Sequence, residues 1–185
     1  VGYLSNYRGD DVLLEPSAGI GGLATFAMED VKKVYLNELS DRRADILEEL
    51  FDDQGSRVVV SRENAEQIDN ILSPEIIPTL VEMNPPFSST AGRIQGERNT
   101  LNSTLHLDQA LRRLAPGGRL VAILGEGATM GQETTDPTGR RPTGANMAKW
   151  WNETMKKYNV RANVGMAGRE YSKYGTGWPQ RIVVI

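Results

Sequence analysis

The sequence predicts an α/β protein in which helices cover a mostly parallel sheet, and three observations support this. Short apolar segments alternate with longer segments of helical periodicity, which is the pattern of a parallel sheet. The first apolar segment leads into a Gly-rich turn, as in nucleotide-binding folds. No internal repeat or second-domain boundary is visible, so we expect one domain over residues 1–185. Seven segments are expected to be strands: 12–14, 34–36, 57–60, 80–83, 120–124, 160–166 and 181–185.

The first half of the chain is expected to contain three helices between its strands. Residues 22–28 follow the Gly-rich turn, and residues 65–72 connect the third strand to the fourth. Residues 41–51 also show a helical pattern, with Ser40 as a candidate N-cap. One face of that helix is apolar and is predicted to be buried: Ala44, Leu47, Leu50 and Phe51.

The second half is expected to contain two helices and two long loops. Helix 104–114 follows a polar loop and has an apolar face that leads to the fifth strand. A second loop, 125–144, is rich in Gly, Thr and Pro, and a loop of that length is usually functional or disordered. Helix 145–158 is amphipathic, and we interpret its apolar residues mainly as core: Met147, Trp150, Trp151, Met155 and Tyr158.

The composition restricts the kinds of site that this chain can build. Of its 185 residues, 39% are apolar and 24% are charged, as in ordinary globular proteins. The absence of cysteine and the single histidine, His106, argue against a zinc or Ser-His-Asp site, so we expect no metal. No apolar stretch approaches the ~20 residues of a membrane span and no signal peptide is evident, which predicts a cytoplasmic protein. The net charge of −3 is unlike that of a free-standing duplex-binding protein.

The Gly-rich turn predicts a nucleotide-binding loop. Gly19-x-Gly21-x-x-Ala24 follows a strand, and Glu38 lies about twenty residues further on, where a carboxylate can accept ribose hydroxyls. Alone, this pattern fits NAD as well as S-adenosylmethionine, and the glycines could serve only close strand–helix packing. Glu15, ahead of the turn, favours S-adenosylmethionine, because a carboxylate attracts a sulfonium or ammonium group but repels a pyrophosphate.

The tetrapeptide Asn84-Pro85-Pro86-Phe87 follows the fourth strand and predicts a site for a planar amine. Two prolines fix φ and remove two backbone donors, which leaves carbonyl oxygens free to face a ligand. The Asn84 side-chain oxygen and the Pro85 carbonyl would accept both N–H bonds of an exocyclic NH2 group, while Phe87 stacks on its ring. The alternative is a plain β-turn, because Asn and Pro are common turn formers. The position favours a site, since doubly wound sheets bind ligands at the carboxyl ends of their strands.

Together these motifs resemble the class I S-adenosylmethionine-dependent methyltransferases, in the branch that methylates amino groups. The resemblance implies a Rossmann-like, doubly wound sheet of seven strands, with a terminal antiparallel hairpin and helices on both faces. Asn64, just past the third strand, would contact the adenine edge of the cofactor or, alternatively, cap the next helix. The cofactor contacts that the resemblance implies are Glu15, Pro16, Ala18, Gly19, Gly21, Glu38, Leu39, Asn64, Ala65 and Asn84.

The segment after the tetrapeptide narrows the substrate. Within this branch, the motif serves N6 of adenine, N4 of cytosine, N2 of guanine in ribosomal RNA and the glutamine amide of release factors. Residues 105–121 are similar to the modification subunits of restriction systems. They look still more like the methyltransferase domain of strawberry-notch-type helicases on phages and plasmids, as do residues 174–177. The resemblance therefore implies N6 of adenine in DNA, with RNA guanine N2 and protein glutamine as alternatives.

Two other classes of function stay open. One is a catalytically silent, cofactor-binding module of a larger helicase protein, against which the intact motifs argue. The other is an NAD-dependent oxidoreductase, which lacks an obvious proton donor here beyond the tyrosines. The chain looks like a domain of a longer protein and shows no target-recognition domain. We therefore expect it to bind DNA weakly by itself, with other domains of the parent chain or a specificity or helicase partner reading the sequence.

Overall fold

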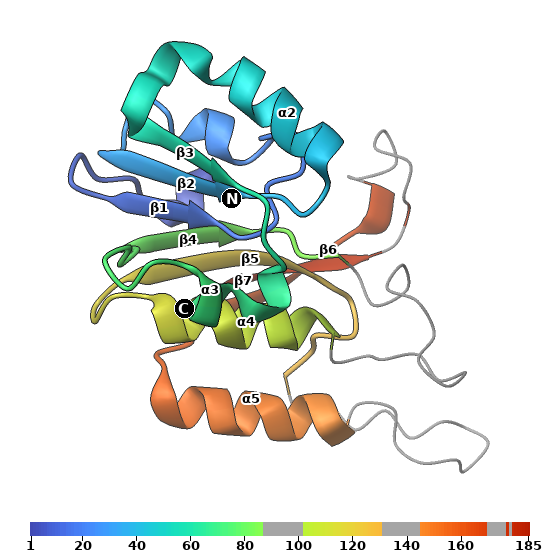
Figure 1. The fold of residues 1–185 in the computed structure, drawn as a ribbon. Helices are drawn as coiled ribbons and strands as arrows, with labels where there is room; N and C mark the ends of the chain where they lie inside the picture. Colours follow the sequence, from blue (N-terminus) through green and yellow to red (C-terminus); the bar gives the residue numbers. More distant parts are fainter. Residues whose placement is uncertain (87–101, 131–144, 170–176, 178) are drawn as a thin grey trace. The chain divides into compact units, whose positions relative to one another are not determined.

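The computed structural model describes residues 1–86, 102–130, 145–169, 177 and 179–185. Within this part of the chain, seven strands form one sheet (Figure 1). The strand order is β3-β2-β1-β4-β5-β7-β6. Strands β1 to β5 pair in parallel, whereas β6 and β7 are antiparallel. This confirms the predicted Rossmann-like, doubly wound α/β fold. The strands are β1 (Val12–Glu15), β2 (Lys33–Asn37), β3 (Val58–Ser61), β4 (Leu80–Met83), β5 (Arg119–Gly125), β6 (Ala162–Met166) and β7 (Gln180–Val184).

Helices connect these strands, and most begin and end within two residues of the predicted positions. An additional short helix, α1, lies in a segment for which no element was predicted. Among the residues described, no helix is both long and apolar enough to span a membrane. The helices are α1 (Gly2–Ser5), η1 (Ala24–Phe26), α2 (Asp41–Leu50), η2 (Asp52–Arg57), η3 (Ala65–Gln67), α3 (Ile68–Ile71), α4 (Asn102–Arg113) and α5 (Ala145–Lys157).

Two of the predicted helices are wrong in extent. In place of helix 22–28 the chain forms only the 3-10 helix η1, in which Ala27 N donates to the Ala24 carbonyl at 2.9 Å. The amide of Ala24 donates to the Glu15 carboxylate, which holds this segment against the end of β1. Helix 65–72 is divided into η3 and α3, because Gln67 has φ −125° and ψ 14°, outside the helical region.

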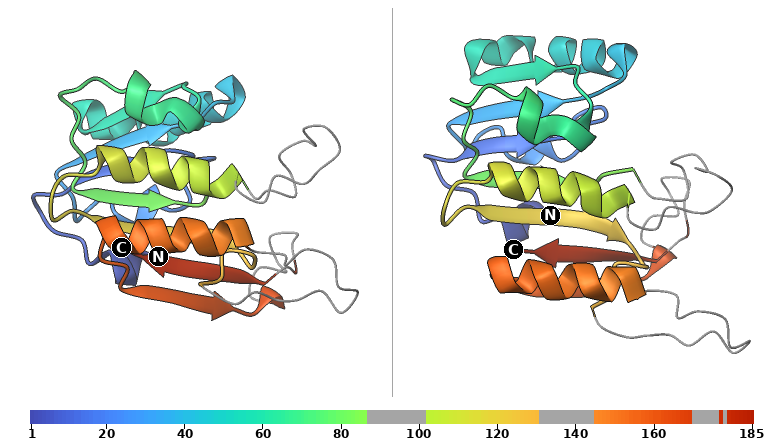
Figure 2. Two further views of the ribbon diagram at one scale, coloured as in Figure 1. Left: turned by 90° about the horizontal axis from the view of Figure 1, so that it is seen from below. Right: turned by 60° about the horizontal axis from the view of Figure 1, so that its bottom comes forward.

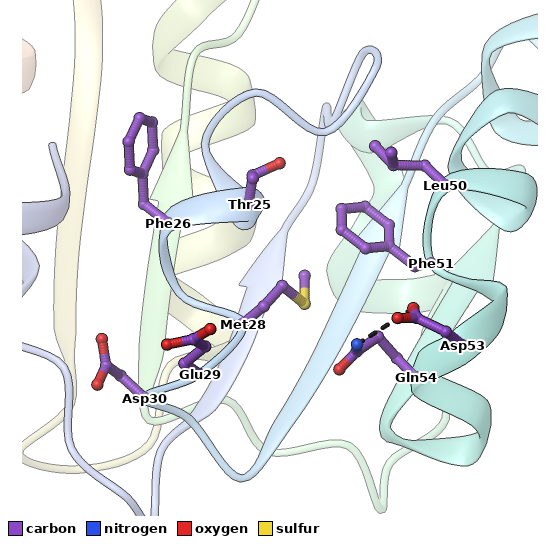
Figure 3. Close-up of a pocket in the computed structure, with 9 residues that line it drawn as sticks. All are labelled: Thr25, Phe26, Met28, Glu29, Asp30, Leu50, Phe51, Asp53 and Gln54. Carbon is purple, nitrogen blue, oxygen red and sulfur yellow. Dashed lines mark hydrogen bonds between the residues drawn. The ribbon is translucent and has the colours of Figure 1, made fainter.

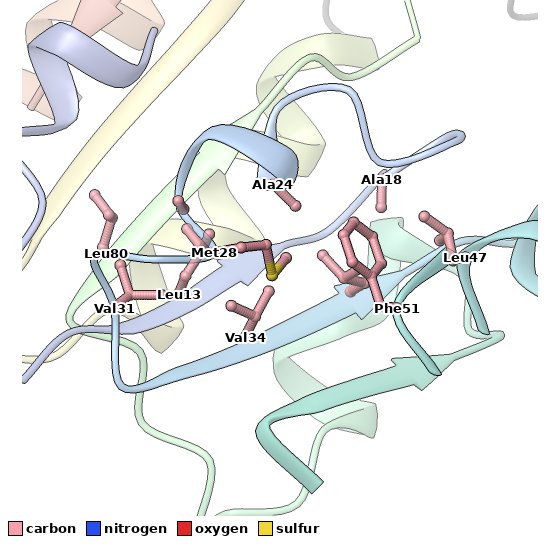
Figure 4. Packing of buried hydrophobic residues seen from close by; sticks show 11 residues of the cluster. Leu13, Ala18, Ala24, Met28, Val31, Val34, Leu47, Phe51 and Leu80 are labelled. Atoms are coloured by element: carbon pink, nitrogen blue, oxygen red, sulfur yellow. The ribbon is translucent and has the colours of Figure 1, made fainter. Parts of the chain in front are cut away.

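The chain forms two compact units, and the first comprises Val1–Pro85 and Leu105–Ala122. One face of its sheet packs against the segment around η1 and against α2 (Figure 4). Leu50 was expected in this core but is 51% exposed, so the apolar face of α2 is narrower than predicted. The buried cluster consists of Leu13, Ala18, Ala24, Ala27, Met28, Val31, Val34, Leu36, Leu47, Phe51 and Leu80.

The opposite face of the sheet in this unit is covered as well. Leu14 and Val81 alternate with residues of the first cluster along their strands, and both are completely buried. Figure 2 shows α3 and α4 side by side. Arg113 of α4 fixes this arrangement by donating to the carbonyls of Leu72 at 2.9 Å and Ile76 at 3.1 Å. Because both faces are covered, a ligand can approach these strands at their ends.

The second unit comprises Pro86–Thr104 and Ile123–Ile185. Trp151 of α5 is 1% exposed and donates from Nε1 to the Ala128 carbonyl at 3.1 Å, so it belongs to the core, as predicted. The expectation is wrong for Met155, which is 43% exposed. Strand β6 begins at Ala162, two residues later than expected, because Val160 N instead donates to the Tyr158 carbonyl in a tight turn.

Candidate active site

The carboxyl ends of four neighbouring strands bring the predicted site residues of the first unit to one edge of the sheet. Glu15 is the last residue of β1, Glu38 follows β2, Asn64 lies shortly after β3, and Asn84 follows β4. Because β3, β2, β1 and β4 are parallel and adjacent in that order, these positions form a row. Open α/β sheets bind ligands at this edge.

The Gly-rich loop after β1 is held against β2 by its backbone. Ala18 N donates to the Asn37 carbonyl at 2.8 Å. Gly19 and Gly21 have φ values of 59° and 84°, in the left-handed region that favours glycine. A Cβ at Gly19 would meet no atom within 4 Å, whereas one at Gly21 would lie 2.9 Å from the Phe51 ring. Gly21 therefore serves close packing against α2, while the open side of Gly19 leaves room for a ligand to approach the backbone.

We expect Gly21→Ala to lower the free energy of unfolding by about 1–3 kcal/mol, because it combines left-handed backbone with a clash against Phe51 and Leu47. Gly22→Ala in the same loop is the matched control. A Cβ at Gly22 meets nothing within 4 Å and its φ is not positive, so its effect should stay within about 0.5 kcal/mol. Urea unfolding of both variants tests this, and equal losses would contradict the packing role of Gly21.

Glu38 is 5% exposed, and its carboxylate joins the glycine loop to the start of α2. Oε2 accepts from Gly19 N at 2.9 Å, while Oε1 accepts from Ser40 N at 2.9 Å and Arg43 Nη2 at 2.6 Å. Burial by itself would raise the pKa of Glu38, but these hydrogen bonds hold it below its usual value. About four lone-pair positions exist on a carboxylate, so one acceptor position is left for a ligand hydroxyl. The expected side-chain cap by Ser40 is not formed.

Asn37 is a positioning residue that the sequence analysis missed. It closes β2 and is 1% exposed. Its Nδ2 donates to the carbonyls of Pro16 and Glu63, both at 2.9 Å, and its Oδ1 accepts from Ser61 Oγ at 2.8 Å. These bonds fix the loops after β1 and β3 to the end of β2. The sequence did contain a signal for this role: Asn37 is an amide residue at the end of a buried strand, directly before Glu38, the carboxylate predicted to bind the ribose.

The residues beyond β2 and β3 differ in their surroundings. Asn64 caps η3, because its Oδ1 accepts from Glu66 N at 3.0 Å, so the capping alternative describes the side-chain oxygen in this structure. Ala65 is buried behind it. Leu39 is 64% exposed next to Glu38 and offers an apolar surface on which a flat ring can pack.

The tetrapeptide after β4 is described up to Pro86. Asn84 is exposed, Pro85 is buried and Pro86 is exposed, while Phe87 lies outside the described residues. An exposed amide at the tip of β4, next to the tip of β1, is accessible to a substrate, as its predicted role requires. The catalytic roles of the four residues stay predictions.

Glu15 is 1% exposed, and its Oε2 accepts from Ala24 N at 3.1 Å. Burial, followed by the neighbouring carboxylate of Glu82 on β4, raises the pKa of Glu15 well above its usual value. Glu82 is the second residue that the sequence analysis missed, because it lies within the apolar segment that forms β4. Its role is considered below.

A pocket of about 460 Å³ opens between residues 25–30 and residues 50–54 (Figure 3). These segments precede β2 and β3, so the pocket lies toward the amino ends of those strands. Its walls combine apolar side chains such as Phe26 with acidic ones such as Asp30. Its position excludes it as the site predicted at the carboxyl ends.

Comparison with solved structures shows a fold shared with proteins described as methyltransferases. The methyltransferase subunit of a type I restriction-modification system from Streptococcus thermophilus matches with a TM-score of 0.71 at 13% identity, covering 100% of this chain and 42% of that chain. An rRNA methylase from the same organism matches with a TM-score of 0.57 at 14% identity, covering 99% and 90%. A Streptococcus mutans protein assigned as a methyltransferase, solved in complex with S-adenosylhomocysteine, matches with a TM-score of 0.55 at 16% identity, covering 98% and 92%.

These likenesses establish a shared fold. This chain spans less than half of the restriction-modification subunit that it matches. No family model and no curated protein matches the sequence.

Proposed function

We propose that this chain transfers a methyl group from S-adenosylmethionine to an exocyclic amine, namely N6 of adenine in DNA. The observation that carries this proposal is the row of strand ends in the first unit. Exposed Asn84 follows β4, next to a loop with an open backbone at Gly19 and the charged acceptor Glu38. These groups fit a cofactor with a ribose and an amino-acid end. The S-adenosylhomocysteine bound to the Streptococcus mutans neighbour supports the same cofactor class.

The chemistry requires an aromatic amine to become a better nucleophile. Asn84 Oδ1 and the Pro85 carbonyl accept its two N–H bonds, which shifts electron density onto nitrogen and favours a pyramidal geometry. Glu38 and the loop at Gly19 would hold the cofactor, which would supply an electrophilic methyl group on a sulfonium. The amine nitrogen would take that methyl group, with the C–N bond forming as the C–S bond breaks. The surplus proton on nitrogen then leaves to solvent, and no histidine or strong base is needed. Positioning and electrostatics by these residues account for the catalysis.

DNA is favoured as the substrate by two observations. The restriction-modification subunit has the highest TM-score among the structures compared above, at 0.71. The segment 105–121 resembles DNA-modifying proteins as well. A base in a duplex must be flipped out to reach Asn84, at a cost of a few kcal/mol, and Phe87 would stack on it. Because the chain spans 42% of that subunit, we assign target recognition to other parts of a parent chain or to a specificity or helicase partner.

The rRNA methylase neighbour keeps RNA guanine N2 as an alternative substrate. Protein glutamine is the other alternative substrate, and a catalytically silent, cofactor-binding module is the alternative without chemistry.

Incubation with S-adenosylmethionine that carries a deuterated methyl group tests the proposal. The substrates are DNA, ribosomal RNA and a glutamine-containing peptide, each digested and analysed by mass spectrometry. We expect labelled N6-methyl-2′-deoxyadenosine. Labelled 2-methylguanosine or methylglutamine would replace the DNA assignment with one of the alternatives. Binding of S-adenosylhomocysteine without any labelled product would point to the silent module, and absence of binding would overturn the proposal altogether.

A further inference from the structure

Two carboxyl side chains, those of Glu15 and Glu82, lie side by side in the interior of the first unit. Strands β1 and β4 pair in parallel with Leu14 opposite Val81. Continuing this register by one residue puts Glu15 opposite Glu82. Residues opposite each other on paired strands project to the same face, with the strands about 4.8 Å apart. Both are buried, at 1% and 0% exposure.

The groups that donate hydrogen bonds to these two carboxyls are neutral. Glu82 Oε1 accepts from Tyr7 OH at 2.8 Å and from Ser5 Oγ. Glu15 Oε2 accepts from the amide of Ala24. Glu82 Oε2 is buried and has no hydrogen-bond partner among the residues that the structure describes. In the part of the chain that the structure describes, none of the ion pairs involves either carboxyl.

Two adjacent buried carboxylates that form no ion pair among the described residues are strongly unfavourable, so such a pair retains a proton. Burial raises the pKa of Glu82, although the hydroxyls and the amino group of Val1 oppose this. The pKa of Glu15 is raised by burial, by Glu82 and by Glu38. The other titratable group in contact, Tyr7, has its own pKa raised by burial, by both carboxyls and by Asp30, so it stays neutral. The pair is thus ready to accept a cation in place of its proton.

We propose that Glu15 and Glu82 form the cation-recognition site for the methionine end of S-adenosylmethionine, sharing a proton when empty and releasing it when the cation binds. This inference rests on the proposed function. Glu15 is the last residue of β1, and Glu82 is the last but one of β4. A cofactor whose ribose reached Glu38 after β2 and whose methyl group reached Asn84 after β4 would pass the ends of β1 and β4. Its positive charge then offsets the second negative charge, and the proton passes to solvent.

Calorimetric titration with S-adenosylmethionine at pH 7, in buffers of different ionisation enthalpy, counts the protons exchanged on binding. We expect release of up to about one proton per site. S-adenosylhomocysteine keeps the ammonium group but lacks the sulfonium charge, so it carries one positive charge fewer and should release less. Glu82→Gln should abolish the release and weaken S-adenosylmethionine binding about tenfold. Glu49→Gln, on the exposed face of α2, is the matched control and should behave as the wild type.

The outcomes separate this inference from the proposed function. Binding of S-adenosylmethionine without proton release would overturn the inference and leave the methyltransferase proposal intact. No binding would overturn the proposed function itself. Release that persists in Glu82→Gln would assign the proton to another group. The wild-type measurement needs no variant, so a folding defect in Glu82→Gln leaves the test valid.

Discussion

Replacing Asn84 by alanine is expected to reduce methyl transfer about 100–1000-fold, the loss typical when a group that stabilises a transition state is removed. The variant loses one of the two acceptors that make the amine nucleophilic. Affinity for S-adenosylhomocysteine should stay within about threefold of the wild type, because Glu38 and the glycine loop still hold the nucleoside. Single-turnover kinetics with labelled cofactor, together with calorimetry, measure the two quantities separately.

Two further variants sharpen this test. Asn84→Asp keeps a side-chain oxygen acceptor and should retain more activity than Asn84→Ala. Asn152→Ala, on the exposed side of α5, controls for removal of an asparagine elsewhere and should leave transfer unchanged. A collapse of cofactor affinity in Asn84→Ala would show that the residue supports the cofactor and would contradict its assignment to the substrate amine.

Glu38→Ala is expected to weaken cofactor binding by about 1–3 kcal/mol, which is about 5–150-fold in affinity. The loss combines hydrogen bonds to the ribose with release of Gly19 N, which Glu38 fixes at 2.9 Å. Because hydrogen bonds hold the pKa of Glu38 below its usual value, the wild type should keep this contribution as the pH falls to about 4.3, where an ordinary Glu titrates, and lose it only below. Calorimetry over a pH series measures both effects.

Two controls accompany the Glu38 variant. Glu49→Ala lies exposed on the same helix α2 and should leave the affinity unchanged. Arg43→Ala removes the ion pair at 2.6 Å but leaves the carboxylate and frees an acceptor position, so its effect should be smaller than that of Glu38→Ala. Unchanged cofactor binding in Glu38→Ala, with unfolding still cooperative, would remove this residue from the site.

Strands β1, β4 and β5 could be predicted from local pattern because each is a short apolar run that is buried almost throughout. The extent of a predicted helix was wrong where a contact with a residue outside the segment changes the backbone. Residues 22–28 have helical character, yet the amide of Ala24 bonds to the buried carboxylate of Glu15 and the segment turns as a 3-10 helix. Leu50 fits the apolar face of α2 in sequence but is 51% exposed in the structure.

The site shows the same division. Glu15, Glu38 and Asn84 could be placed at one edge from the sequence, because topology puts residues at or just after the ends of parallel strands there. Their roles in binding and catalysis stay predictions. Asn37 and Glu82 were missed because their sequence neighbourhood reads as ordinary strand. Their importance comes from burial among polar partners, and that depends on which strands become neighbours.

The sequence by itself determined the alternation of strands and helices, the glycine loop and the residues at the strand tips, because these follow from hydrophobic periodicity and backbone stereochemistry within a few residues. Only the tertiary structure decided which polar groups are buried together, since pairing β4 with β1 brings Glu82 beside Glu15. In the described part of the chain, one oxygen of Glu82 is then left without a hydrogen-bond partner.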